Sequence, residues 1–185
     1  MMVFCVIAGG AVLLLLWAAV LYNGLVRVRN ACDESWSDID TELRRRYDLI
    51  PNLVETVKGY AAHEREVLER VVQARQAAVA NHGSPNAQAR DENALIDSMK
   101  RLFAVAENYP TLKADRHYLE LMQELSNTED RIARARRFYN ANVRDLSNRI
   151  EVFPSNLVAG LFGFQKREFF DIEDRTVRQP PAVRV

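Results

Sequence analysis

The sequence lacks charge over its first 26 residues and has too few cysteines for a cross-linked fold. Residues 1–26 contain no Asp, Glu, Lys or Arg, so all 25 basic and 25 acidic residues follow them. The only cysteines are Cys5 and Cys32, which do not make a disulfide framework. This distribution excludes a uniformly soluble chain, a disulfide scaffold and a disordered protein. It predicts a membrane anchor joined to one charge-rich domain.

Sequence motifs that mark known chemistry are absent as well. There is no Gly-x-Ser-x-Gly, no glycine-rich phosphate loop and no His-Glu-x-x-His. The three histidines, at positions 63, 82 and 117, include no pair four residues apart that would hold zinc from one helix face. We therefore expect no enzyme activity and no metal or other cofactor. Because the net charge is zero and no known nucleic-acid-binding motif appears, we also expect no nucleic-acid partner.

The uncharged N-terminal segment has the length of a transmembrane helix. As a helix, residues 1–26 would measure about 39 Å, and a bilayer core of about 30 Å needs about 20 such residues. A cleaved signal peptide is the alternative, but it normally opens with basic residues and has a shorter apolar run. Aromatic residues suited to the membrane interface end the segment and arginines follow it: Trp17, Tyr22, Arg27 and Arg29. These arginines favour an N-terminus outside and a domain in the cytoplasm.

Beyond the anchor, apolar residues recur with the period of a helix in three stretches. The first, residues 30–80, carries a series of heptads that fails at Glu64: Trp36, Leu43, Ile50, Val57, Val71 and Ala78. A companion series three residues further on fails at Arg46: Ile39, Leu53, Tyr60, Val67 and Ala74. The middle stretch carries Leu95, Met99, Leu102 and Ala106. The third, residues 112–152, carries an unbroken series: Tyr118, Leu125, Ile132, Tyr139, Leu146 and Phe153.

Breaks between these stretches set the topology. Ser84 with Pro85 forms a good helix start, and Pro110 and Pro154 each end the preceding helix. Pro51 predicts a kink or a break in the first stretch. No window alternates with period two, so the fold class is all-α: a single N-terminal transmembrane helix followed by an antiparallel bundle of long helices, three long plus a short C-terminal helix. An extended coiled coil is the alternative packing of the same heptads.

The domain organisation follows from these boundaries. We assign residues 1–28 to a transmembrane anchor that contacts the lipid bilayer through residues 1–26. Residues 29–173 form the helical-bundle domain. Residues 174–185, which include Pro180 and Pro181, are predicted to be a disordered tail.

Several motifs in the helical domain resemble the LemA family. The most specific is WSDIDTELRRRYDLIPNLVETVKGYAAHE at residues 36–64, and the others are residues 107–114, 124–140, 153–154 and the phenylalanines near 163–170. The resemblance covers residues 1–173. It implies a bacterial protein with one membrane-spanning helix and a helical bundle, and it supplies no catalytic residues. With the positive-inside rule, it places the chain in the cell inner membrane as a single-pass protein with its C-terminal domain in the cytoplasm.

The most specific motif also holds a cluster of polar residues: Asn52, Glu55, His63 and Glu64. One hypothesis is a polar pocket that binds a ligand or metal. The other, which we favour, is that Asn52 and Glu55 satisfy helix ends around Pro51. Glu64 then lies partly buried on the apolar face and pairs with an Arg or Tyr of the third helix, because a lone buried carboxylate is costly.

A basic stretch on the third helix offers a second candidate surface. Arg134, Arg137 and Arg144 share a helix face, and they either contact anionic lipid or pair with acidic residues of the first helix, as we favour. The aromatic cluster Phe162, Phe164, Phe169 and Phe170 either plugs the bundle end or forms an exposed patch.

The absence of a catalytic constellation beside a long patterned bundle favours an interaction protein. We expect a scaffold that binds an unknown membrane or envelope protein, or copies of itself as a homo-oligomer. The alternative is a lipid-contacting, self-assembling membrane organiser. An unrecognised enzyme or ligand receptor using residues 52–64 is the third hypothesis.

Overall fold

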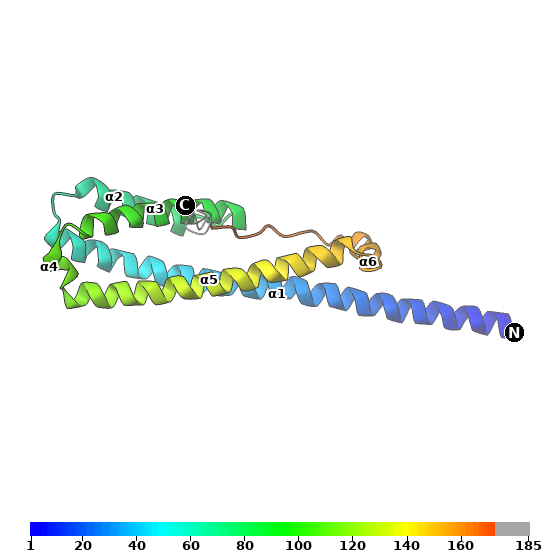
Figure 1. Cartoon of the computed structure of the whole chain (residues 1–185). Helices are drawn as coiled ribbons and strands as arrows, with labels where there is room; N and C mark the ends of the chain where they lie inside the picture. The colour runs from blue at the N-terminus through cyan, green and yellow to red at the C-terminus, as the bar shows by residue number, and fades with distance from the viewer. Residues whose placement is uncertain (173–185) are drawn as a thin grey trace, which may run out of the picture. The chain divides into compact units, whose positions relative to one another are not determined.

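All regular secondary structure in the described part of the chain is helical. The computed structural model describes residues 1–172, without the side chains of Met2, Cys5 and Val6. The predicted tail, residues 174–185, lies outside the described residues. The helices in chain order are α1 (Met2–Tyr60), α2 (Arg65–Ala80), α3 (Pro85–Ala106), α4 (Pro110–Lys113), α5 (Arg116–Glu151) and α6 (Ser155–Leu161) (Figure 1). The all-α prediction is confirmed.

The first long stretch divides at a different place from the one the sequence indicated. Helix α1 runs through Pro51 without a break and ends at Tyr60, and α2 begins at Arg65. Residues 61–64 form the turn, closed by a hydrogen bond from the Glu64 amide to the Ala61 carbonyl (3.0 Å). Of the two outcomes expected at Pro51, a break is therefore wrong, and a kink stays a prediction. The predicted anchor and the first helix of the domain form one continuous element.

Pro51 is tolerated because another side chain replaces the hydrogen bond it removes. Proline has no amide hydrogen, so the carbonyl four residues earlier, at Tyr47, loses its helical donor. Arg75 of α2 donates from Nε to this Tyr47 carbonyl at 2.6 Å. The guanidinium thus satisfies a backbone group that would otherwise lack its helical partner beside the buried Tyr47 side chain.

Most remaining helix boundaries follow the sequence, but the third stretch, predicted as one helix over residues 112–152, is divided into α4 and α5 at residues 114–115. Ser84 caps α3 by accepting from the Ala87 amide (3.4 Å), with Pro85 in the first turn. Pro110 begins the short α4. Helix α5 ends at Glu151, just before the Phe153–Pro154 bond. Phe153, which the heptad series placed on the apolar face, lies beyond this end and is 72% exposed, so that assignment is wrong.

The chain divides into two compact units. The anchor unit comprises Met1–Asp40 with Ala133–Phe169, and the bundle unit comprises Thr41–Ile132 with residues 170–172 of the described chain. In the bundle unit, residues 41–60 of α1, then α2, α3 and residues 116–132 of α5, run alternately up and down (Figure 1). Their inward faces carry the predicted apolar series, including Ile50, Val57, Val71, Leu95, Leu102 and Leu125.

In the anchor unit, the stretch of α1 that leads up to Asp40 lies beside the C-terminal part of α5, whereas the N-terminal end of α1 projects past it (Figure 1). Asn142 on α5 donates from Nδ2 to the Ala31 carbonyl and to the Ser35 hydroxyl, each at 3.2 Å. The rings of Trp36 and Tyr139 pack with centroids 5.3 Å apart. The buried apolar residues of this unit include Leu25, Cys32, Ile39, Val143 and Leu146.

Candidate functional site

The predicted polar cluster of residues 52–64 does not close into a pocket. Asn52, Glu55 and His63 are exposed, and Glu55 pairs with Lys58 on its own helix (Nζ to Oε1, 3.1 Å). Of the four residues in the cluster, only Glu55 lines the groove described below. Three or more His, Cys, Asp or Glu side chains that could share a metal ion are not found anywhere in residues 1–172.

Glu64 is half-buried, but its position differs from the one the sequence indicated. It is the residue that precedes α2, and its carbonyl accepts from the Leu68 amide at 3.2 Å. A bond from its carboxylate to an Arg or Tyr of the third helix is not seen among the described residues. The failure of the heptad series at Glu64 therefore marks a turn between two helices.

The arginines singled out on α5 point to solvent. Arg134, Arg137 and Arg144 are exposed, and within residues 1–172 none of them forms an ion pair. Two acidic residues of α1 that were expected to pair with them bind elsewhere: Glu42 lies 3.8 Å from Arg45, and Glu55 binds Lys58. These guanidinium groups thus remain available to an external anionic partner.

The sequence analysis missed a buried ionic cluster in the bundle unit. Arg46 of α1 has a fully buried side chain and pairs with Glu92 of α3, which is fully buried too. Arg46 also pairs with Glu129 of α5 (NH1 to Oε1, 3.0 Å), whose side chain is 41% exposed. The Tyr47 hydroxyl donates to Glu92, and Gln88 donates from Nε2 to the same carboxylate at 2.9 Å.

This cluster is a closed polar core rather than an open site. Taking both charges out of water is costly, and the cost is offset only because Glu92 also accepts hydrogen bonds from neighbouring polar groups. Its role is to hold α1, α3 and α5 together at one register. The signal was present in the sequence, because Arg46 interrupts the companion series of the first stretch and Glu92 occupies the heptad position seven residues before Met99.

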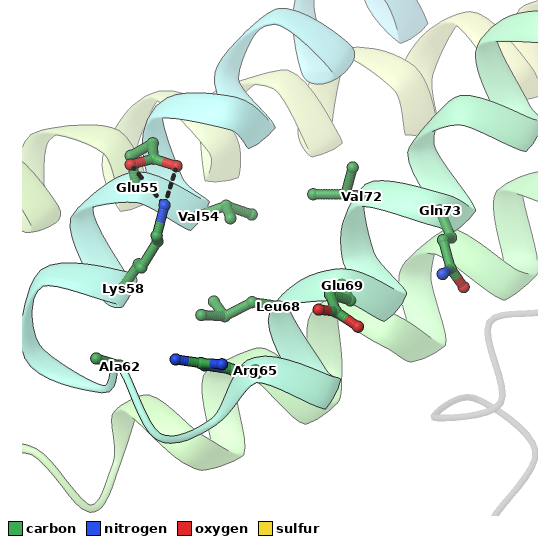
Figure 2. Close-up of a pocket in the computed structure, with 9 residues that line it drawn as sticks. All are labelled: Val54, Glu55, Lys58, Ala62, Arg65, Leu68, Glu69, Val72 and Gln73. Carbon is green, nitrogen blue, oxygen red and sulfur yellow. Dashed lines mark hydrogen bonds and ion pairs between the residues drawn. The ribbon is translucent and has the colours of Figure 1, made fainter.

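An open groove lies in the bundle unit between the end of α1 and α2. Its volume is about 580 Å³. Figure 2 shows the apolar side chains of Val54, Leu68 and Val72 between the two helices. Val54 and Leu68 are buried, whereas Val72 is 37% exposed. The remaining lining residues are mostly charged or polar and are exposed: Glu55, Lys58, Ala62, Arg65, Glu69 and Gln73.

Aromatic side chains gather in the anchor unit where the uncharged segment ends. The Tyr22 ring lies 4.7 Å from Phe162 and 5.8 Å from Phe164, centroid to centroid. The Arg29 guanidinium lies 5.4 Å from the Phe164 ring centroid. Helix α6 buries Val158 and Ala159 but exposes Leu157 and Leu161. Phe153 and Phe162, which flank the helix, are exposed as well. The predicted plug is therefore only partial.

Two titratable groups of the anchor unit are buried near one another. Burial raises the pKa of Cys32, and its side chain is fully covered. Cys32 therefore packs as a small residue. Burial also raises the pKa of Tyr139 to about 12, and the Tyr139 hydroxyl donates to the Glu168 carbonyl at 2.9 Å.

The N-terminal part of α1 has the surface of a membrane-spanning helix. Within the described residues, α1 is the one helix long and apolar enough to cross a bilayer. Its consecutive leucines Leu13, Leu14, Leu15 and Leu16 are each at least 60% exposed. No protein surface covers them, unlike the leucines of a buried core helix, and a lipid environment removes them from water.

Comparison with known proteins finds one family and several relatives. The model of the LemA family matches residues 35–185. Magnetosome protein MamQ 2 of Paramagnetospirillum magneticum is 28% identical over 174 residues, which cover 80% of this chain and 64% of that protein. Protein LemA of Metamycoplasma hominis is 28% identical over 151 residues, which cover 81% of this chain and 66% of that protein. About a third of each relative therefore lies outside the match.

Proposed function

The chain belongs to the LemA family, and from that premise we propose that this membrane-associated protein is an anchored scaffold that binds a partner protein in the groove between α1 and α2. The proposal places it in the bacterial inner membrane as a single-pass protein, with the bundle in the cytoplasm. It assigns the chain no catalytic activity and no nucleic-acid partner. The observation that carries it is the open groove with its apolar floor.

The lining of the groove favours an amphipathic helix as the occupant. Sites for small molecules usually place a few buried polar groups to orient the ligand. Here the charged residues of the groove are exposed at its edges, where Glu55 and Lys58 keep 70% and 58% of their side chains accessible. Apolar side chains spaced along a partner helix would cover Val54, Leu68 and Val72, while charges of both signs meet the edges.

A photo-crosslinking amino acid placed at Val72 in the full chain tests this proposal in native membranes. The matched control is Val79, which lies on the same helix, is 41% exposed and is not part of the groove lining. We expect position 72, and not position 79, to give an adduct with one apolar helical segment of a different protein, located by mass spectrometry of the cross-linked peptide.

Substitutions give the second arm of the experiment. With the crosslinker moved to Gln73, Val72→Glu should abolish the adduct and Val79→Glu should preserve it, because only the first places a charge on the groove floor. Equal adducts from positions 72 and 79 would contradict the groove. Adducts only to a second copy of this chain would replace the foreign partner with self-association.

A second candidate function is a self-assembling membrane organiser, favoured by the exposed apolar side chains around α6. In reconstituted vesicles, an environment-sensitive fluorophore at Leu161 should report an apolar surrounding if α6 contacts lipid. Phe138, also in the anchor unit and 59% exposed against 80% for Leu161, is the control position. A water-like signal at both positions, with a monomeric mass, would eliminate this candidate.

A further inference from the structure

A second cavity lies in the anchor unit, apart from the groove proposed for a partner. Its volume is about 380 Å³. One wall is formed by α1 between Val20 and Arg27, and the opposite wall by Arg149 of α5 and Ser155, the first residue of α6. The cavity therefore spans the point at which the uncharged segment gives way to the first basic residue.

The lining of this cavity changes from apolar to cationic along α1. Val20, Leu21 and Leu25 supply apolar surface, and Arg27 and Arg149 supply positive charge. None of the lining residues is acidic. Such a gradient matches a molecule with a hydrocarbon chain and an anionic head, since each end meets a surface of its own kind.

An ion pair with Asp145 fixes the Arg149 side chain through Nε and leaves its terminal amino groups available as donors. Its Nε donates to the Asp145 carboxylate at 3.1 Å and 3.2 Å. Its NH1 group lies over Gly24, where an added Cβ would come within 3.2 Å of it. The missing side chain at Gly24 thus lets the guanidinium approach α1 closely. The ion pair with Asp145 occupies Nε, and the terminal amino groups remain for a second acceptor.

Arg27 faces the same cavity from α1. It is exposed, and no ion pair or hydrogen bond joins its side chain to any other residue from 1 to 172. Two guanidinium groups on opposite walls suit a phosphate, which accepts paired hydrogen bonds from such planar donors. Asn23 adds an exposed amide to the lining.

The aromatic contacts place the cavity at the depth of lipid headgroups when α1 spans a bilayer. Tyr22 lies within the stretch of α1 that lines the cavity and packs on Phe162 and Phe164. Aromatic rings prefer the interface between hydrocarbon and water, and arginines prefer the layer of phosphates just beyond it. The exposed side chains of Leu157 and Leu161 lie on α6, whose first residue, Ser155, lines the cavity.

We propose that this cavity is a binding site for an anionic phospholipid, whose phosphate lies between Arg27 and Arg149. The upper part of its acyl chain follows Val20 and Leu21. The site is distinct from the scaffold groove, because its residues all belong to the anchor unit and those of the groove all belong to the bundle unit. It depends on α1 spanning the membrane, but not on any protein partner.

Native mass spectrometry of the full chain in nanodiscs of phosphatidylcholine and phosphatidylglycerol tests the proposal. The wild-type chain should retain a phosphatidylglycerol molecule after release from the disc. Arg27→Gln with Arg149→Gln should lower the retained fraction about tenfold or more. The matched control is Arg137→Gln with Arg144→Gln, which removes the same charge from α5 of the same unit without touching the cavity.

Further arms separate the remaining explanations. Arg27→Glu alone should also release the lipid, and this exposed residue is unlinked to the core, so a folded variant is expected by circular dichroism. Equal loss in both arginine pairs would mean a diffuse charge effect and would overturn the site. Release of the lipid by millimolar inorganic phosphate would reassign the cavity to a free anion. A failed crosslink in the α1–α2 groove leaves this result unaffected.

Discussion

At the scale of the residue, burial decides how much each charged side chain contributes to the free energy of unfolding. Arg46 and Arg45 are neighbours in sequence, yet the first is completely buried and the second keeps 54% of its side chain exposed. A long pair with one exposed partner, such as Arg45–Glu42 at 3.8 Å, contributes about 1 kcal/mol or less. A buried partner that loses its counter-charge costs much more, because the remaining ion cannot reach water.

Arg46→Met should therefore lower the free energy of unfolding by about 3–5 kcal/mol, because it leaves the Glu92 carboxylate buried with only Tyr47 and Gln88 as donors. Arg45→Met should cost about 1 kcal/mol or less. Urea unfolding of the full chain in detergent, followed by circular dichroism, measures both. Similar costs for the two variants would show that Arg46 is hydrated in solution.

Ionisation of the Tyr139 hydroxyl makes the free energy of unfolding depend on pH in the alkaline range. Burial raises its pKa to about 12, above the ordinary value of 10. The folded state thus holds this proton more tightly than the unfolded state. The resulting stabilisation is complete below pH 10 and is lost as the pH rises through 12.

We expect the absorbance of tyrosinate to show one ionisation near pH 12 that is missing in Tyr139→Phe. The difference in unfolding free energy between wild type and this variant should shrink over the same pH range. If Tyr139→Phe instead removes an ionisation near pH 10, the hydroxyl is accessible to water and its bond to the Glu168 carbonyl does not persist.

At the scale of the element, side chains from one helix decide whether another can continue. Helix α1 passes through Pro51 because Arg75 of α2 supplies the donor that the Tyr47 carbonyl lacks. If this is correct, the two residues are coupled. Pro51→Ala restores an amide donor within α1, after which the Arg75 hydrogen bond is no longer needed.

A double-mutant cycle measures this coupling. Arg75→Met in the wild-type chain should cost about 1–3 kcal/mol, because a partly buried carbonyl loses its partner. The same change in a Pro51→Ala chain should cost little, which gives a coupling energy of about 1 kcal/mol or more. Equal costs in the two backgrounds would mean that water satisfies the Tyr47 carbonyl. Arg70→Met, which removes an exposed pair with Glu66 on the same helix, is the control.

At the scale of the element, some helix boundaries could be predicted from the sequence and others could not. Most of helix α5 was predictable because its heptads run unbroken from Tyr118 to Leu146 and Pro154 follows its end. Its start at Arg116 was not, because no proline or glycine separates it from α4. The turn at residues 61–64 was not, because its Ala-Ala-His-Glu sequence contains no glycine or proline and only Gly59 precedes it. The effect of Pro51 could not be predicted either, since it depends on a side chain 24 positions away in the chain. Arg46 and Glu64 were flagged as exceptions, but only the fold reveals that one marks a buried ion pair and the other a turn.

At the scale of the whole molecule, the anchor and the family evidence concern different parts of the chain. The family match begins at residue 35, whereas the segment suited to spanning a bilayer lies before Arg27. The membrane assignment therefore rests on the physical character of α1: its length, its lack of charge and its exposed leucines. Orientation depends on the charges at the two ends of that segment.

The proposed orientation follows from the unequal number of basic residues on the two sides of the span, which substitutions can reverse. Residues 1–26 contain no Lys or Arg, whereas Arg27 and Arg29 follow the span directly, and the positive-inside rule retains such residues in the cytoplasm. In a bacterial host, a C-terminal green fluorescent protein should fluoresce and a C-terminal alkaline phosphatase should be inactive. Lysines inserted after Met2, combined with Arg27→Gln and Arg29→Gln, should invert both results. Glutamines inserted at the same place should not.

These reporters also constrain the two proposed sites. If the phosphatase is active on the unaltered chain, the groove between α1 and α2 faces outside, and its partner must be an envelope protein rather than a cytoplasmic one. The lipid site at Arg27 and Arg149 survives either orientation, but its lipid would come from the other leaflet. Anionic lipids attract basic residues in either leaflet. Retention of phosphatidylglycerol together with an inverted reporter would therefore show that the site lies at headgroup depth whichever way the anchor crosses the membrane.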